Sequence, residues 1–182
     1  MKETKHQKKK VWELERHSVE SYQSVKKIPL FIVLDNVRSL NNIGAVFRTS
    51  DAFLVEKIFL CGITAQPPHR DIHKTALGAT ESVDWEYEES TLELVKKMNK
   101  QGIHTIAIEQ TTYSTLLHDF KPTATQKYAL IFGNEVKGVQ QEVVDECENC
   151  IEIPQLGTKH SLNIAVTAGI TIWDFFKSMK AE

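Results

Sequence analysis

Short apolar runs alternate with stretches of mixed polarity along most of the chain. The run after Pro29 is rich in branched and aromatic residues and is too short for a core helix, so it predicts a buried strand. Four later runs have the same character. The five expected strands are "LFIVLD" (30–35), "KIFLCG" (57–62), "HTIAIEQ" (104–110), "YALIFG" (128–133) and "CIEIP" (150–154).

The segments between these runs have helical character. Helices are expected near 42–54, 70–77, 90–100, 138–146 and 161–179. Alternating strands and helices predict an α/β fold with a mostly parallel sheet flanked by helices. Ligands bind such sheets where the strands end, so the loops that follow strands are the places to search for a site.

The first 27 residues differ from the rest. "MKETKHQKKK" holds five lysines and almost nothing apolar, which predicts a tail that is either only solvated or seeks phosphate groups. Residues 11–26 predict a helix with Trp12, Val19 and Tyr22 as packing residues. We therefore expect a basic tail and helical extension at 1–27 and one globular domain at 28–182.

Composition limits the function classes. A chain of 182 residues with 41% hydrophobic content can bury the core of one domain. The net charge of -2 means that nucleic-acid contacts must come from local basic patches. No apolar run approaches the about 20 residues that span a bilayer, and no signal peptide is evident. We expect a soluble, cytoplasmic protein that does not bind a membrane.

Metal and disulfide chemistry are not expected. The cysteines, Cys61, Cys147 and Cys150, form an odd set, and the pair in "CENC" lacks the second pair that a structural zinc needs. His69 and His73 share a helical face, but "HRDIH" lacks the glutamate of a zinc protease motif. We expect ordinary thiols and histidines that are exposed or contact RNA.

The first loop of interest is "LDNVRSLNNIGAVFRTSDAF". Asn41 or Asn42 can cap the helix that follows, and Gly44 leaves room for a ligand beside Arg48. The alternative is that Arg48 pairs with Asp51 one turn later on an exposed surface.

The second loop, "ALIFGNEVKGV", follows a strand. Gly133 allows close approach of a ligand to the backbone and, with Gly138, brackets a tight polar loop. Val139 and Gln140 stand where a phosphate-binding loop would carry Lys and Ser or Thr, and no G-x-G-x-x-G pattern occurs, so both standard nucleotide motifs are excluded.

The third segment is "IEIPQLGTKHSLNIAVTAGITIWDFF". Read alone, Ser161 is most simply the cap of the last helix. The small residues Ala165, Ala168 and Gly169 would let another backbone approach that helix closely.

Together the three segments resemble the three motifs of the SpoU/TrmH family of RNA methyltransferases, part of the SPOUT superfamily. The matching positions are Asn42-x-Gly44-x-x-x-Arg48, then Phe132-Gly133-Asn134-Glu135 with Gly138, then Ile153-Pro154 and Ser161-Leu162-Asn163. The resemblance implies an α/β fold with a deep C-terminal trefoil knot and a homodimer. It also implies S-adenosylmethionine as cofactor and methyl transfer to RNA, typically at a ribose 2'-oxygen.

The resemblance also implies roles for individual residues. The catalytic set is Arg48, Asn42, Glu135, Ser161 and Asn163, and the cofactor-binding set is Glu109, Gly133, Ile153, Ser161 and Leu162. We expect the RNA to contact Arg38, His69, Arg70 and Lys74 besides the lysine tail. A guanidinium stays protonated, so our hypothesis is that Arg48 holds a phosphate and stabilises the developing oxyanion.

Several alternatives stay open at this point. We favour tRNA over rRNA because the chain is short and has a basic arm, an argument from fold analogy. A knotted enzyme that methylates a base, or an RNA-binding relative without catalysis, would share much of this pattern. Trp173, Phe175 and Phe176 are either dimer contacts or core residues.

Overall fold

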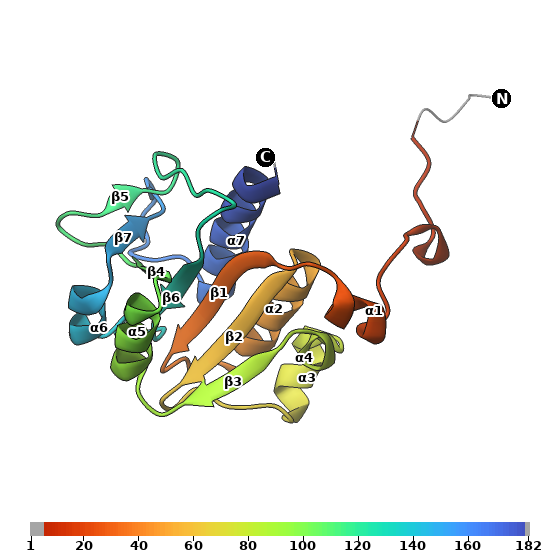
Figure 1. Ribbon diagram of the computed structural model, residues 1–182, viewed down its shortest axis with the longest axis horizontal. Coiled ribbons are helices and arrows are strands. Elements are labelled where there is room, and N and C mark those ends of the chain that lie inside the picture. The colour runs from red at the N-terminus through yellow and green to blue at the C-terminus, as the bar shows by residue number, and fades with distance from the viewer. Residues whose placement is uncertain (1–5, 181–182) are drawn as a thin grey trace.

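The computed structural model describes residues 6–180, which form a seven-stranded sheet covered by helices (Figure 1). All strand pairs are parallel, and the strand order is β3-β2-β1-β6-β4-β7-β5. The predicted α/β class is confirmed. The strands are β1 (Ile28–Asp35), β2 (Val55–Cys61), β3 (Trp85–Glu88), β4 (His104–Ile108), β5 (Thr115–Leu116), β6 (Tyr128–Phe132) and β7 (Asn149–Glu152).

All five predicted strands are present, while β3 and β5 were missed. β3 has the sequence WEYE and pairs only with β2, and β5 has two residues and pairs only with β7. Both lie at edges of the sheet. An edge strand does not need the unbroken apolar run that marks a strand buried on both faces.

Helices cover both faces of the sheet (Figure 1). One apolar cluster joins the strands to α2 (Leu40–Ala52), α3 (Arg70–Ala76), α4 (Ala79–Ser82) and α7 (Ile164–Lys180). A second joins them to α5 (Thr91–Lys100) and α6 (Gln141–Glu146). Along β6 the side chains alternate, with Leu130 in the first cluster and Ile131 in the second. Because both faces are buried, the run is apolar throughout.

The expected helix over 11–26 is wrong in extent. It is replaced by a single turn, η1 (Val11–Glu13), and by α1 (Val19–Ser24), which Ser18 caps. Tyr22 packs in the core at 4% exposure, but Trp12 is 76% and Val19 37% exposed, so only one of the three expected packing residues is buried. Residues 1–5 of the lysine tail lie outside the described residues.

The strand order fixes where a ligand can enter. The chain runs from β1 outward through β2 to β3 and then crosses to β4, and β6 later fills the position between β1 and β4. The loops that follow β1 and β4 therefore lead away from each other on the two sides of β6. Open parallel sheets bind ligands at such a point, outside the carboxyl ends of the strands. The trefoil knot stays a prediction. Within residues 6–180, no helix is long and apolar enough to cross a bilayer.

Candidate active site

The loop after β6 folds back on itself. Asn134 and Gly138 exchange backbone hydrogen bonds of 3.0 and 2.9 Å, and Gly138 has φ +69. A Cβ on Gly133 would lie 2.0 Å from the carbonyl carbon of Gly138 and 2.0 Å from the nitrogen of Val139. The missing side chain of Gly133 therefore makes room for the returning backbone of Gly138 and Val139. The sequence had indicated room for a ligand instead.

Two carboxylates from neighbouring strands hold this loop in place. Asp35, the last residue of β1 and fully buried, accepts from the backbone N–H of Gln140 at 3.0 Å. Glu109, directly after β4, accepts from the N–H of Val139 at 3.0 Å and from that of Gln110 at 2.9 Å. Because β6 lies between β1 and β4, the loop is fixed from both sides.

Asp35 was missed in the sequence, although a charged residue that ends the run LFIVLD is an identifiable signal. It also accepts the hydroxyl of Thr91 at 2.6 Å. Such partners are what a fully buried carboxylate needs.

Glu135 projects from the loop to the beginning of α2. Its carboxylate accepts from the backbone N–H groups of Arg38 (3.0 Å) and Ser39 (2.9 Å) and from the side-chain amide of Asn42 (3.3 Å). Partial burial acts to raise the pKa of Glu135, but these donors outweigh it and lower the pKa below its ordinary value. Glu135 is therefore held as a carboxylate.

The cap of α2 differs from the expectation. Ser39 caps the helix by accepting from the backbone N–H of Asn42 at 3.3 Å, so the assignment of Asn41 or Asn42 as the cap is wrong. The Asn42 side chain is instead free to bond across the loops.

Asn163 completes the polar contacts. Its side-chain amide donates to the side-chain oxygen of Asn42 at 3.1 Å, and its own oxygen accepts from the backbone N–H of Ala165 at 2.9 Å. Asn163 thus caps α7, which begins at Ile164, and the reading of Ser161 as the cap is wrong. A continuous row of hydrogen bonds, Glu135–Asn42–Asn163, joins the three loops that the sequence singled out.

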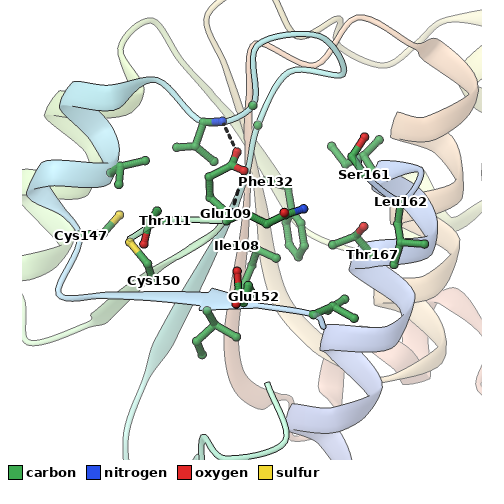
Figure 2. Close-up of a pocket in the computed structure, with 18 of the residues that line it drawn as sticks. Ile108, Glu109, Thr111, Phe132, Cys147, Cys150, Glu152, Ser161, Leu162 and Thr167 are labelled. Atoms are coloured by element: carbon green, nitrogen blue, oxygen red, sulfur yellow. Dashed lines mark hydrogen bonds between the residues drawn. The ribbon is translucent and has the colours of Figure 1, made fainter. Parts of the chain in front are cut away.

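These loops surround a cavity of about 1210 Å³ at the carboxyl edge of the sheet (Figure 2). Ser161 and Leu162 lie on its α7 side, and Cys147 and Cys150 lie on the opposite side, with Glu109 between them. The cavity is lined by all five residues predicted to bind the cofactor: Glu109, Gly133, Ile153, Ser161 and Leu162. Glu135 and Asn163 from the predicted catalytic set also line it.

Arg48 lies apart from the cavity lining, on an exposed face of α2. It forms no ion pair with any described residue. The alternative pairing with Asp51 is not observed, because the Asp51 carboxylate accepts the Ser82 hydroxyl instead.

Gly44 has a packing role that the sequence reading missed. A Cβ on it would lie 2.1 Å from the Thr75 hydroxyl oxygen and 2.3 Å from the Ile72 carbonyl oxygen, both on α3. The interpretation that Gly44 leaves room for a ligand beside Arg48 is therefore wrong: α3 fills that room.

The residues expected to contact RNA are exposed. Arg38 stands at the loop before α2, and its backbone holds Glu135. Arg70 and Lys74 lie on α3, which packs against α2, and the His69 ring accepts from the backbone N–H of Asp71 at 3.2 Å as the cap of α3. Basic side chains thus occupy the same side of the sheet as Arg48.

The cysteines are free thiols, with Cys61 buried and the other two partly buried. Burial raises the pKa of Cys61 and of Cys147 to about 12, and it also raises that of Cys150. Such thiols carry almost no thiolate at neutral pH. Among residues 6–180, no group of three or more His, Cys, Asp or Glu side chains could hold a metal ion.

A sequence model described as the SpoU rRNA Methylase family matches residues 29–173, a span that contains all three loops and every contact of the row above. The chain belongs to this family. The resemblance expected from the motifs is confirmed at the level of the family.

Named relatives of the SpoU family agree with this assignment. The chain is 26% identical over 156 residues to the 23S rRNA (guanosine-2'-O-)-methyltransferase RlmB of Neisseria meningitidis, covering 86% of this chain and 61% of the relative. The protein of the same name from Vibrio parahaemolyticus is 27% identical, with 89% and 64% covered. The chain thus spans about three fifths of the length of these relatives.

Solved structures share the fold. The A. aeolicus TrmH/SpoU tRNA modifying enzyme aligns with a TM-score of 0.79 at 22% identity, over 90% of this chain and 83% of that one. The AdoMet-bound rRNA methyltransferase of Sinorhizobium meliloti aligns with a TM-score of 0.76 at 23% identity, over 86% and 59%. The SpoU-type arrangement of sheet and helices is therefore common to all three chains.

Proposed function

We propose that the protein is an S-adenosylmethionine-dependent RNA methyltransferase that transfers a methyl group to a ribose 2'-hydroxyl. The observation that carries this proposal is the row of hydrogen bonds Glu135–Asn42–Asn163 at the rim of the cavity. Packing alone does not require three distant polar residues to meet at one exposed point. An orienting site for a polar acceptor does require it.

The cavity fits the cofactor. It is large enough for a nucleoside, its walls include Ile153 and Leu162, and the backbone around Gly133 can read the edge of an adenine. When bound, S-adenosylmethionine supplies a methyl group on a cationic sulfur, and the carboxylates that line the cavity suit that charge. The AdoMet-bound relative supports this choice.

The chain's own residues would align the acceptor. We assign Asn42 and Asn163 to hold the ribose hydroxyl, with ionised Glu135 fixing the Asn42 amide. Arg48, an exposed guanidinium, would hold a phosphate beside that hydroxyl and stabilise the negative charge that develops on its oxygen. Ser161 lines the cavity and completes the catalytic set. Loss of the hydroxyl proton would be aided by the phosphate that Arg48 holds.

The proposed acceptor is a folded RNA in the cytoplasm, with tRNA favoured over rRNA. Relatives carry names of both kinds, a 23S rRNA enzyme and a tRNA modifying enzyme. The tRNA choice rests on the basic arm of this sequence, which suits a compact folded RNA. Arg38, His69, Arg70 and Lys74 would contact the RNA backbone.

A homodimer is part of the proposal, as is the knot. Val166, Ile170 and Trp173 recur at helical spacing on α7 and are 40–50% exposed. Such an apolar stripe on a surface is typical of an interface. Phe175 is fully buried, so of the three aromatic residues considered for the dimer it belongs to the core, whereas Trp173 belongs to the stripe and stacks on Phe176.

The decisive experiment supplies methyl-labelled S-adenosylmethionine with bulk tRNA and, separately, with bulk rRNA. The labelled RNA is then treated with alkali, which cleaves only where the 2'-hydroxyl is free. We expect label in an alkali-resistant dinucleotide from tRNA. Label in ordinary mononucleotides would point to base methylation, and cofactor binding without transfer to either RNA would contradict the proposal.

A further inference from the structure

Residues 6–18, the N-terminal arm, stand away from the globular body (Figure 1). The arm is attached through α1, where buried Tyr22 packs against the core and the Lys27 ammonium lies 3.8 Å from the centre of its ring. Side chains upstream of α1 are mostly exposed. The fold therefore anchors the base of the arm, and most side chains of the arm are not covered by any other part of residues 6–180.

Trp12 is the most unusual residue of the arm. Its indole is 76% exposed, although a ring of this size normally gains by burial or by contact with a ligand. The turn that carries it is closed by a 2.9 Å hydrogen bond from the Glu13 N–H to the Lys10 carbonyl, and the Glu13 carboxylate accepts from the Lys10 N–H at 2.7 Å. The Lys10 ammonium lies 5.1 Å from the centre of the indole, which is a cation–π distance.

The charge of the arm favours a polyanion over an apolar partner. Its basic residues are Lys8, Lys9, Lys10 and Arg16, against two acidic ones, Glu13 and Glu15, whereas the whole chain carries a net charge of -2. An apolar groove on a protein would accept the indole but not the adjacent lysines. A single-stranded nucleic acid accepts both, since bases stack on aromatic rings and phosphates pair with lysines.

We infer that the arm is a second RNA-binding element, in which Trp12 stacks on an unpaired base and Lys8 to Lys10 contact the adjacent phosphates. This inference rests on the proposed function, because it takes RNA as the substrate. The arm joins the body before β1, at the amino edge of the sheet, and the cavity opens at the carboxyl edge. It would thus recognise a part of the RNA other than the methylated nucleotide.

The test measures binding of the full chain to three RNA probes: bulk tRNA, a twelve-nucleotide oligouridine and a fully paired RNA duplex. Trp12→Ala should weaken binding to the oligouridine by roughly 5- to 100-fold, as expected for loss of one stacked base. Trp12→Phe, which keeps a ring, should bind within about threefold of the wild type. Binding to the duplex should be unchanged by both, because paired bases offer no free face.

Charge is tested separately. A triple variant tests the lysines: Lys8→Gln, Lys9→Gln and Lys10→Gln combined. The plot of log affinity against log salt concentration has a negative slope, and for single strands the variant should make it shallower by about 2. The matched control removes three lysines from α5, Lys96, Lys97 and Lys100, and should leave the slope unchanged. All variants should bind S-adenosylmethionine as the wild type does.

Three results would overturn the inference. The first is Trp12→Leu binding the oligouridine as well as the wild type, and the second is Trp12→Ala weakening binding to the duplex as much as to the single strand. A change in sedimentation without a change in RNA affinity would also overturn it, since it would assign Trp12 to a protein interface. The outcome is separable from that of the proposed function. If the wild type methylates RNA and Trp12→Ala binds the oligouridine as the wild type does, only the RNA-binding role of the arm is rejected. If Trp12→Ala weakens oligouridine binding but the wild type methylates no RNA, only the proposed enzyme activity is rejected.

Discussion

The side-chain amide of Asn163 donates to the side-chain oxygen of Asn42 over 3.1 Å, although the two residues lie 121 positions apart. Asn42 in turn donates to Glu135 at 3.3 Å. The Asn42 amide accepts from one neighbour and donates to the other, which an ionised carboxylate of the same shape cannot do because it lacks the donor.

Asn42→Asp tests that relay with almost no change in shape. It places a second carboxylate beside Glu135, so we expect methyl transfer to fall at least about 100-fold, on the scale of losing an orienting group in the transition state. The thermal midpoint should also drop at pH 7 and recover partly below pH ~4.5, where carboxylates become protonated. Asn41→Asp, one exposed position earlier, is the control and should keep both activity and stability.

Glu135→Gln isolates the charge of the carboxylate. Burial acts to raise the pKa of Glu135, but the backbone and side-chain donors outweigh it and lower the pKa below the ordinary value of 4.5. The ionised carboxylate therefore stabilises the folded state fully above pH 4.5. This stabilisation is lost as the pH falls through the lowered pKa of the folded state. The difference in thermal midpoint between wild type and variant should therefore be largest near pH 7 and shrink below pH ~4. A difference that grew on acidification would contradict the lowered pKa.

Arg48→Lys keeps the charge but removes the planar fork. If Arg48 holds a phosphate with two parallel hydrogen bonds, kcat should fall by about 100-fold while cofactor affinity measured by calorimetry stays the same. Lysine would still attract RNA, so KM should change little. Near-normal methylation by this variant would show that the fork is unnecessary and that point charge suffices.

Two helical glycines give opposite predictions for the same substitution. Gly44→Ala would bring a methyl group to 2.3 Å from the Ile72 carbonyl oxygen, so α2 and α3 must separate, and we expect a loss of about 1–3 kcal/mol in the free energy of unfolding. Gly169→Ala on α7 meets nothing within 4 Å in this chain, but Gly169 shares a helical face with the proposed dimer stripe. Measured in the Ile170→Lys background, where no dimer is expected, it should be neutral or stabilise by up to about 1 kcal/mol. Denaturant unfolding of the two variants measures both, and equal effects would contradict the packing role of Gly44.

The dimer is tested on the exposed stripe of α7. Ile170→Lys puts a charge at its middle, and the wild type should sediment as a dimer and the variant as a monomer. Ile63→Lys is the control, since Ile63 is 60% exposed and lies after β2, away from the stripe. A monomeric wild type would reject this interface.

The central strands were predictable because burial on both faces leaves an unbroken apolar run, as in LFIVLD and YALIFG. WEYE and the two-residue β5 carry no such run, and their pairing is decided by neighbours that the local sequence does not contain. The cap of α2 was missed for the same reason. Ser39 and Asn42 are both good caps, and the choice between them depends on Glu135, 93 positions beyond Asn42.

Among the site residues, the sequence brought together the ones that share the cavity, since all five residues expected to bind the cofactor line it; their binding role stays a prediction. The packing role of Gly44 could not be predicted from the sequence. A glycine one turn before an arginine gives the same sequence pattern whether a ligand or a neighbouring helix fills the space beside it. Asp35 was overlooked because a charged residue at a strand end is ordinary in sequence. Only its burial and its bond to Gln140 reveal that it holds the loop after β6.

The position of β6 also constrains how the protein is made. β1 and β4 are synthesised before β6, yet neither can meet its native neighbour on that side until residues 128–132 have left the ribosome. The β1 edge therefore stays unpaired on this side from residue 35 until residue 128 is made, and the β4 edge stays unpaired from residue 108. Apolar edges of this kind invite pairing with other chains. A fragment that ends before residue 128 should aggregate, whereas the full chain closes the sheet.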